Sequence, residues 1–149
     1  MDAVLLDTDV FSFLNKQGDT HAELYRPHVK GKTIALSFVT VGELYVWTIK
    51  KQWSAKRIAA LEQRIKAAVI VPYDLELCKE YSRVKTSLPA GKTVAANDLW
   101  IATRAIRHSL PLLTHNAKHF EDIPRLIVIT EVGRPAPQQS GGLFDPPSK

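Results

Sequence analysis

Three acidic residues that are far apart in the chain, Asp7, Glu43 and Asp98, each lie where an apolar strand or loop is expected to pass into a helix. In an α/β protein, strand ends and helix starts gather along one edge of the sheet, where ligands bind. Separated carboxylates that converge at such an edge are typical ligands of a hard divalent cation such as Mg²⁺ or Mn²⁺. The three residues therefore predict a metal site, and metal-dependent phosphoryl chemistry is the first hypothesis.

The elements that must position these acids alternate along the chain. Short apolar runs predict five strands, at residues 3–7, 33–37, 69–71, 112–114 and 126–129. Apolar residues at helical spacing predict helices from Thr8 to the break at Gly18 and then at about 19–29, 39–51, 54–67, 74–88 and 96–108. Pro27 is expected to end or bend the second helix near Arg26. The alternation predicts an α/β protein with a mostly parallel sheet flanked by helices.

Size and composition limit the class of protein. A chain of 149 residues, 45% of them hydrophobic, can form one domain with a buried core. Its 20 Lys and Arg residues exceed its 15 Asp and Glu residues, and the net charge of +5 favours a polyanionic partner. The single cysteine, Cys78, cannot form an internal disulfide, and no apolar stretch resembles a signal peptide or a transmembrane helix. We expect a cytoplasmic protein without membrane contact, with a domain at 1–132 and a flexible or partner-docked tail at 133–149.

Each of the three acids also has a purely structural interpretation. Asp7 could cap the first helix, where its charge would complement the helix dipole. Thr40 and Glu43 have the spacing of a capping box. Asp98 could occupy the first turn of its helix beside a capping Asn97. The metal hypothesis is favoured because all three acids mark the same edge of the same sheet.

Four segments of the sequence occur in an order and at a spacing that resemble a known family. They are residues 5–10 (LLDTDV), 41–44 (VGEL), 97–102 (NDLWIA) and 112–116 (LLTHN), the last followed by Phe120. Together they resemble the PIN-domain family, and most closely the VapC-type toxins of bacterial toxin–antitoxin pairs, over about residues 3–130. The resemblance implies a PIN-like three-layer α/β/α sandwich. It also implies a Mg²⁺- or Mn²⁺-dependent ribonuclease, usually a homodimer, that is silenced by a small antitoxin whose tail covers the acidic site.

Matched position by position, Asp7, Glu43 and Asp98 correspond to the core metal-binding acids of this family. The fourth position departs from the family pattern. Many PIN domains place an Asp after the Leu-Leu-Thr strand, where this chain has Asn116, and His119 stands where VapC-like proteins often have another Asp. Asn116 brings no negative charge, so one tightly held ion is a safer prediction than two.

Other polar residues in these motifs are candidates for accessory roles. Asp9, at a position often filled by Asn in the family, could partly restore the charge that Asn116 lacks. Thr8 and Thr114 could orient metal-bound waters or a phosphate, or could simply satisfy local backbone groups. Asp122 is a further acid nearby that no motif places in the site.

Two tryptophans lie close to these motifs. Trp47 follows Glu43 by four residues, and its helical position predicts packing in the core or at a dimer contact. Trp53 lies beside Lys50 and Lys51 at a helix end and is the better candidate for a contact with RNA.

Two other functions remain open at this point. An apolar strand followed by Asp7-Thr8-Asp9 is similar to the start of haloacid-dehalogenase-type phosphatases, in which the first Asp is a nucleophile. That mechanism also needs a downstream lysine and a later acidic pair, of which Asn97-Asp98 supplies one acid, and it has no role for Glu43. The other alternative is a non-catalytic PIN-like scaffold that binds RNA or a protein after losing metal affinity through Asn116.

Overall fold

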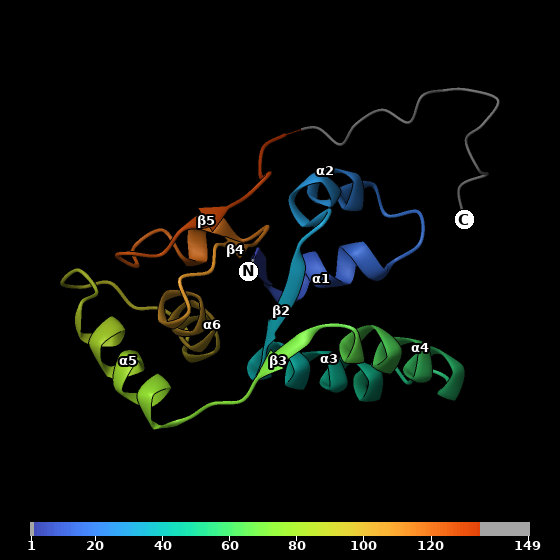
Figure 1. Ribbon diagram of the computed structural model, residues 1–149, viewed down its shortest axis with the longest axis horizontal. Helices are drawn as coiled ribbons and strands as arrows, with labels where there is room; N and C mark the ends of the chain where they lie inside the picture. Colours follow the sequence, from blue (N-terminus) through green and yellow to red (C-terminus); the bar gives the residue numbers. More distant parts are fainter. Residues whose placement is uncertain (1, 135–149) are drawn as a thin grey trace.

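Five short strands form the centre of the structure (Figure 1). The computed structural model describes residues 2–134. The strands are β1 (Ala3–Leu6), β2 (Thr33–Ser37), β3 (Val69–Val71), β4 (Leu112–Leu113) and β5 (Val128–Ile129). Their order across the sheet is β3-β2-β1-β4-β5, and every neighbouring pair is parallel. The prediction of a mostly parallel sheet is confirmed.

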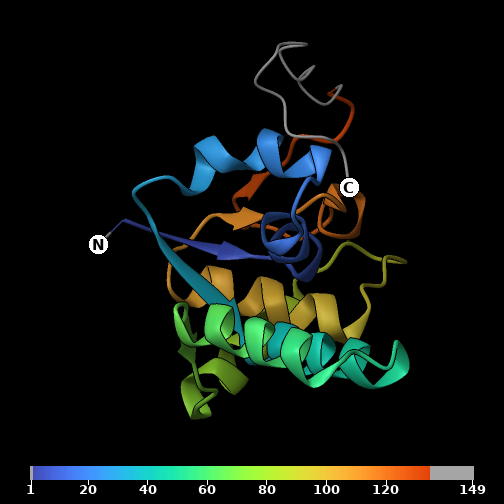
Figure 2. The same ribbon diagram turned by 90° about the vertical axis from the view of Figure 1, so that its right-hand side faces the viewer.

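Helices cover both faces of this sheet. Within residues 2–134 they are α1 (Thr8–Asn15), α2 (Thr20–Val29), α3 (Phe38–Lys50), α4 (Ala55–Lys66), α5 (Leu75–Thr86), α6 (Ala96–Arg107) and the 3₁₀ helix η1 (Ala117–His119). Figure 2 shows α2 on one side of the strands and α6 on the other. The arrangement is the predicted three-layer α/β/α sandwich.

The central strand β1 explains why the sheet needs helices on both faces. Successive side chains of a strand point to opposite faces. Val4 and Leu6 accordingly pack with residues of α1 to α4, whereas Leu5 packs with residues of α5 and α6. All three side chains are at most 1% exposed. A strand without polar residues on either face can be stable only inside such a sandwich.

The register of the strands brings chemically important residues to one edge. Leu6 of β1 pairs with Leu36 of β2 on one side and with Leu113 of β4 on the other. The backbone N–H of Asp7 then donates to the carbonyl oxygen of Leu113 at 2.8 Å. Asp7 and Thr114, which directly follow β1 and β4, therefore lie side by side at the carboxyl edge of the sheet.

The helix starts near this edge differ from two of the structural interpretations. Helix α3 is capped by Ser37, whose hydroxyl accepts the N–H of Val39, so Thr40 and Glu43 lie inside the helix and form no capping box. Helix α6 begins at Ala96 without a side-chain cap, so Asn97 does not cap it, but Asp98 lies in its first turn as predicted. Because Glu43 forms no capping box, its carboxylate is available for contacts outside α3.

Other expectations need smaller corrections. Helix α2 does not end at Arg26 but continues to Val29. Pro27 has no backbone N–H to donate, but it lies in the last turn of the helix, where the missing hydrogen bond does not stop the helix. Strands β4 and β5 are two residues long each, shorter than predicted. The predicted tail, 133–149, lies outside the described residues apart from Gly133 and Arg134. No helix within residues 2–134 combines the length and the apolar character needed to cross a membrane.

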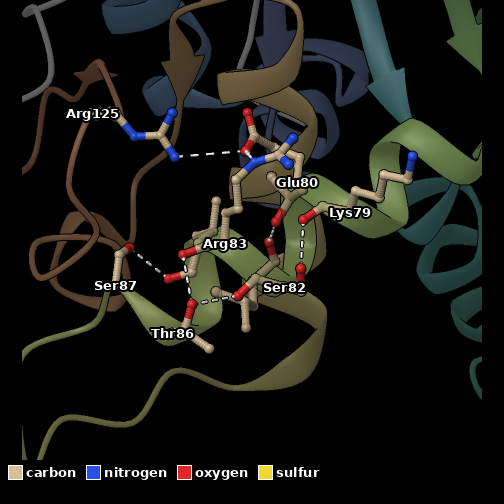
Figure 3. A network of polar contacts seen from close by, with 10 residues as sticks. Lys79, Glu80, Ser82, Arg83, Thr86, Ser87 and Arg125 are labelled. Atoms are coloured by element: carbon tan, nitrogen blue, oxygen red, sulfur yellow. Dashed lines mark hydrogen bonds and ion pairs between the residues drawn. The ribbon is translucent and has the colours of Figure 1, made fainter.

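An ion-pair network fixes α5 to the segment that precedes β5 (Figure 3). The buried carboxylate of Glu80 accepts a hydrogen bond from Arg83 Nε at 2.9 Å and lies 3.7 Å from Arg125 Nη2. The hydrogen bond from Arg83, with the charges of both arginines, lowers the pKa of Glu80. This network ties α5, which packs against α6, to the segment before β5.

Candidate active site

Asp7 is the most deeply buried acid of the predicted set, with 6% of its surface exposed. Its Oδ1 accepts the backbone N–H of Thr8 at 2.8 Å, so it does cap α1. Its Oδ2 accepts the hydroxyl of Thr114 at 2.7 Å. Burial raises the pKa of Asp7, and the negative charge of Asp98 acts in the same direction. Asp7 therefore does more than cap α1, because its charge also interacts with that of Asp98 on α6.

Glu43 is held by Thr8, across the boundary between α3 and α1. The Thr8 hydroxyl donates to Glu43 Oε1 at 2.7 Å, and its oxygen lies 3.1 Å from the hydroxyl oxygen of Thr40. Thr8 is 6% exposed and Thr40 is fully buried, so this contact is shielded from water. Thr8 thus fixes the direction of the Glu43 carboxylate.

Asp98 faces His119, which belongs to η1. The His119 Nδ1 lies 3.2 Å from Asp98 Oδ2, and the two side chains are 57% and 22% exposed. Burial raises the pKa of Asp98, His119 opposes this effect, and the negative charge of Glu43 adds to it. Because Asp98 interacts with both Asp7 and Glu43, the structure brings the three predicted acids into one electrostatic cluster.

Two of the accessory candidates, Asp9 and Asn116, contact each other. Asp9 Oδ2 accepts Asn116 Nδ2 and the backbone N–H of His115, both at 3.1 Å, while its Oδ1 accepts the N–H of Val10 at 2.7 Å. Burial, reinforced by the charge of Asp7, raises the pKa of Asp9 to about 7. The pair ties α1 to the loop after β4, and the amide of Asn116 is engaged there.

Thr114 connects Asp7 to the same loop. It is fully buried, and its hydroxyl donates to Asp7 while accepting the backbone N–H of Asn116 at 3.0 Å. Its hydroxyl is thus engaged with the carboxylate of Asp7 and the backbone of the loop after β4.

Two further residues support the site: Thr40, which the sequence singled out only as a possible helix cap, and Tyr25, which it did not single out. Thr40 lies against Thr8, as described above, and Tyr25 of α2 lies beneath the loop after β4. The fully buried Tyr25 hydroxyl accepts the N–H of Glu131 at 3.0 Å and lies 2.6 Å from His115 Nδ1. The sequence around Tyr25 does not predict these contacts, because His115 and Glu131 are about a hundred positions away in the chain.

The donor atoms of the cluster are of the type that a divalent cation requires. Asp7, Glu43 and Asp98 offer only carboxylate oxygens, which suit Mg²⁺ and Mn²⁺. Their negative charges disfavour one another, and a bound cation would remove this repulsion. As the side chains stand within residues 2–134, no three His, Cys, Asp or Glu side chains are grouped closely enough to hold an ion. The residues fit a cation in chemistry and charge, and binding would have to draw the carboxylates together.

A cavity of about 190 Å³ lies between α1, α3 and α4, and none of the three acids lines it. Its lining includes Trp47, one helical turn after Glu43, and the half-buried Trp53. The guanidinium of Arg57 lies 3.8 Å from the centre of the Trp53 ring and covers one of its faces. Trp47 packs against the core, as predicted. The contact of Trp53 with RNA stays a prediction.

Comparison with known proteins identifies the fold family. The family model described as PIN domain matches residues 4–126. The chain belongs to the PIN-domain family. This membership disfavours the dehalogenase-type phosphatase, because the likeness extends over Glu43 and Asp98 and not only over the first strand.

Curated relatives and solved structures of similar chains agree on one branch of this family. The chain is 29% identical to Ribonuclease VapC2 of Rickettsia felis over 126 residues, which covers 83% of this chain and 94% of the relative. It is 30% identical to Ribonuclease VapC5 of Mycobacterium tuberculosis, over 76% of this chain and 83% of the relative.

Two solved structures show how similar the fold is. A crystal structure of VapBC2 from Rickettsia felis bound to a promoter DNA fragment contains a chain of 25% identity, with a TM-score of 0.73 and coverage of 86% of this chain and 98% of that one. VapBC-5 of Mycobacterium tuberculosis, a member of the VapBC family of toxin–antitoxin systems, gives 27% identity and a TM-score of 0.65, with coverage of 87% and 99%.

Proposed function

We propose that this PIN domain is a metal-dependent endoribonuclease and the toxin of a toxin–antitoxin pair. The observation that carries the proposal is the electrostatic interaction of Asp98 with both Asp7 and Glu43, together with the contact that each of the three acids makes with a side chain from another segment. The similarity to VapC ribonucleases over most of their length supports the assignment of RNA as substrate. The net charge of +5 suits a polyanionic substrate.

Asp7, Glu43 and Asp98 are the residues that would hold Mg²⁺ or Mn²⁺. Such an ion supplies an activated water for attack on the phosphodiester and neutralises charge on the phosphate. The chain's own task is to keep the three carboxylates charged and correctly directed. The hydroxyl of Thr114 lowers the pKa of Asp7 against the effect of burial, and the hydroxyl of Thr8 directs Glu43. Both threonines therefore act by positioning acids.

Asp9 and Asn116 have a different accessory role in this proposal. Their hydrogen bond fixes the loop after β4, which carries Thr114 and leads to His119. Asp9 also interacts electrostatically with the cluster, because the negative charge of Asp7 raises the pKa of Asp9. We infer that one ion is held, because neither Asn116 nor His119 supplies a fourth carboxylate.

An antitoxin and a second copy of the chain are the proposed protein partners. The antitoxin is inferred from the similarity to chains of VapBC toxin–antitoxin complexes. The homodimer is supported by apolar side chains that remain on the surface: Phe38, Tyr73 and Leu75 are 37%, 64% and 69% exposed. The ring of Phe38 lies 5.8 Å from that of Tyr73, so these two side chains form one apolar surface.

The proposal is tested by RNA cleavage with the purified full chain in Mg²⁺, in Mn²⁺ and in EDTA. We expect cleavage with the ions, none in EDTA, and a loss of at least a hundredfold in Asp98→Asn. Asp122→Asn is the matched control, because this acid lies on the loop after η1 and pairs with Lys92 at 3.9 Å. Cleavage that survives both EDTA and Asp98→Asn would overturn the metal mechanism. No cleavage of varied RNAs, together with no ion binding in calorimetry, would favour a non-catalytic scaffold.

A further inference from the structure

His119 lies at the acidic cluster although it is not an acid. It is the last residue of η1, and its side chain is 57% exposed, so it can adjust without disturbing the core. Its Nδ1 is 3.2 Å from Asp98 Oδ2. The alternative donor on the same loop, Asn116, is directed to Asp9 by a hydrogen bond of 3.1 Å. Of the two residues that could complete the cluster, the one that faces Asp98 is therefore the histidine.

The separation of these two atoms matches that of two ligands on a single cation. In an octahedral site with bonds of about 2.1 Å, neighbouring donor atoms are about 3 Å apart. An ion could thus bind Nδ1 and Oδ2 together with little change in their separation. In the absence of an ion, the same contact is a hydrogen bond in which Nδ1 donates to the carboxylate.

We propose that His119 is a nitrogen ligand of the metal site and makes the site prefer a first-row transition-metal ion such as Mn²⁺ over Mg²⁺. This inference rests on the proposed function, since it concerns the ion held by Asp7, Glu43 and Asp98. Mg²⁺ is a hard ion that binds oxygen and retains its waters, whereas transition-metal ions accept imidazole nitrogen readily. Three carboxylates alone would give the ion only oxygen ligands, which suit Mg²⁺ as well as Mn²⁺.

The test measures the ligands of the ion directly, without relying on cleavage. Mn²⁺ is bound to the full chain, and pulsed electron paramagnetic resonance detects nitrogen coupled to the ion. We expect nitrogen coupling in the wild type and its loss in His119→Gln and His119→Asp. His28→Gln is the matched control, because His28 lies on α2 and pairs with Glu131 at 3.4 Å. Competition with Mg²⁺ should show that His119→Asp lowers the preference for Mn²⁺ at least tenfold.

The outcomes separate this inference from the proposed function. Nitrogen coupling that persists in His119→Gln, or an unchanged preference in His119→Asp, would overturn the role of His119 alone. Mn²⁺ binding and RNA cleavage without any nitrogen coupling would do the same and leave the ribonuclease intact. A wild-type chain that binds no divalent ion would overturn both proposals. Unfolding curves of each variant establish that the protein tested is folded, which is expected because His119 is exposed.

Discussion

Asp9 provides a direct test of the electrostatics of the site. Burial, with the charge of Asp7, raises its pKa from the ordinary 3.8 to about 7 in the folded protein. The folded chain therefore binds a proton more tightly than the unfolded chain between these two values. Stability must then fall as the pH rises from about 4 to about 7, and the penalty is complete above pH 7. The substitution Asp9→Asn removes this penalty, so in EDTA we expect the variant to gain stability relative to the wild type across that range.

The size of the gain follows from the shift. One pKa unit corresponds to about 1.4 kcal/mol, so a shift of roughly three units sets an upper limit of about 4 kcal/mol. Asp9 is only half-buried, and solvent screening should reduce the gain to about 1–3 kcal/mol. Its two oxygens accept three N–H donors, whereas asparagine offers one acceptor oxygen, which costs about 1 kcal/mol at every pH. The variant should therefore be less stable than the wild type near pH 4.5 and more stable near pH 8.

Urea unfolding followed by tryptophan fluorescence, in EDTA from pH 4.5 to 8.5, measures this difference. Asp7 and Asp98 titrate in both proteins, so most of their contribution cancels. The control is Asp2→Asn, which removes a carboxylate whose side chain is 81% exposed. A difference between Asp9→Asn and the wild type that is flat with pH, or that falls as the pH rises, would refute the reasoning.

Three further substitutions test other contacts. Thr8→Val removes the hydroxyl that directs Glu43, so it should lower kcat for RNA cleavage about 10–100-fold. Thr8→Ser keeps a hydroxyl and should restore kcat, and equal activity of the two variants would contradict a positioning role. Tyr25→Phe leaves a buried N–H without its acceptor and should lower the free energy of unfolding by about 1–3 kcal/mol. The exposed Tyr73→Phe should change it little, and similar losses in both would disprove the assignment. Glu80→Gln should cost about 1 kcal/mol at pH 7, measured by urea unfolding; because the pKa of Glu80 is lowered, this cost must shrink as the pH falls below about 4.5.

The fold could be predicted because its signals are local and consistent. The apolar residues Val4, Leu5 and Leu6 can be buried on two faces only in a sheet with helices on both sides. The cap of α3 could not be predicted, because Ser37 and Thr40 both carry a hydroxyl at a plausible start. Which of them caps the helix depends on where β2 stops pairing with β1, and that is decided by contacts between distant segments.

Two of the three predicted acids could be located from local signals, since Asp7 follows β1 and Asp98 lies in the first turn of α6, whereas Glu43 lies inside α3. The fourth position could not. Asn116 and His119 are three residues apart in a loop that contains a 3₁₀ turn, and both carry suitable donor atoms. The 3₁₀ turn places His119 beside Asp98, whereas Asn116 donates a hydrogen bond to Asp9. This choice depends on the side-chain directions of two loops that meet only in the folded chain.

The hydrogen bond between Asp7 and Thr114 joins residues 107 positions apart, and β1 lies between β2 and β4 in the sheet. One of the two strands that pair with β1 therefore does not exist until the chain has been made as far as β4. During translation, the nascent chain carries Asp7 and Glu43 long before it carries Asp98, Thr114 or His119. Premature termination at any earlier codon yields a product without an assembled centre. If the proposed ribonuclease activity needs these residues together, this order of segments postpones it until synthesis of the domain is nearly finished.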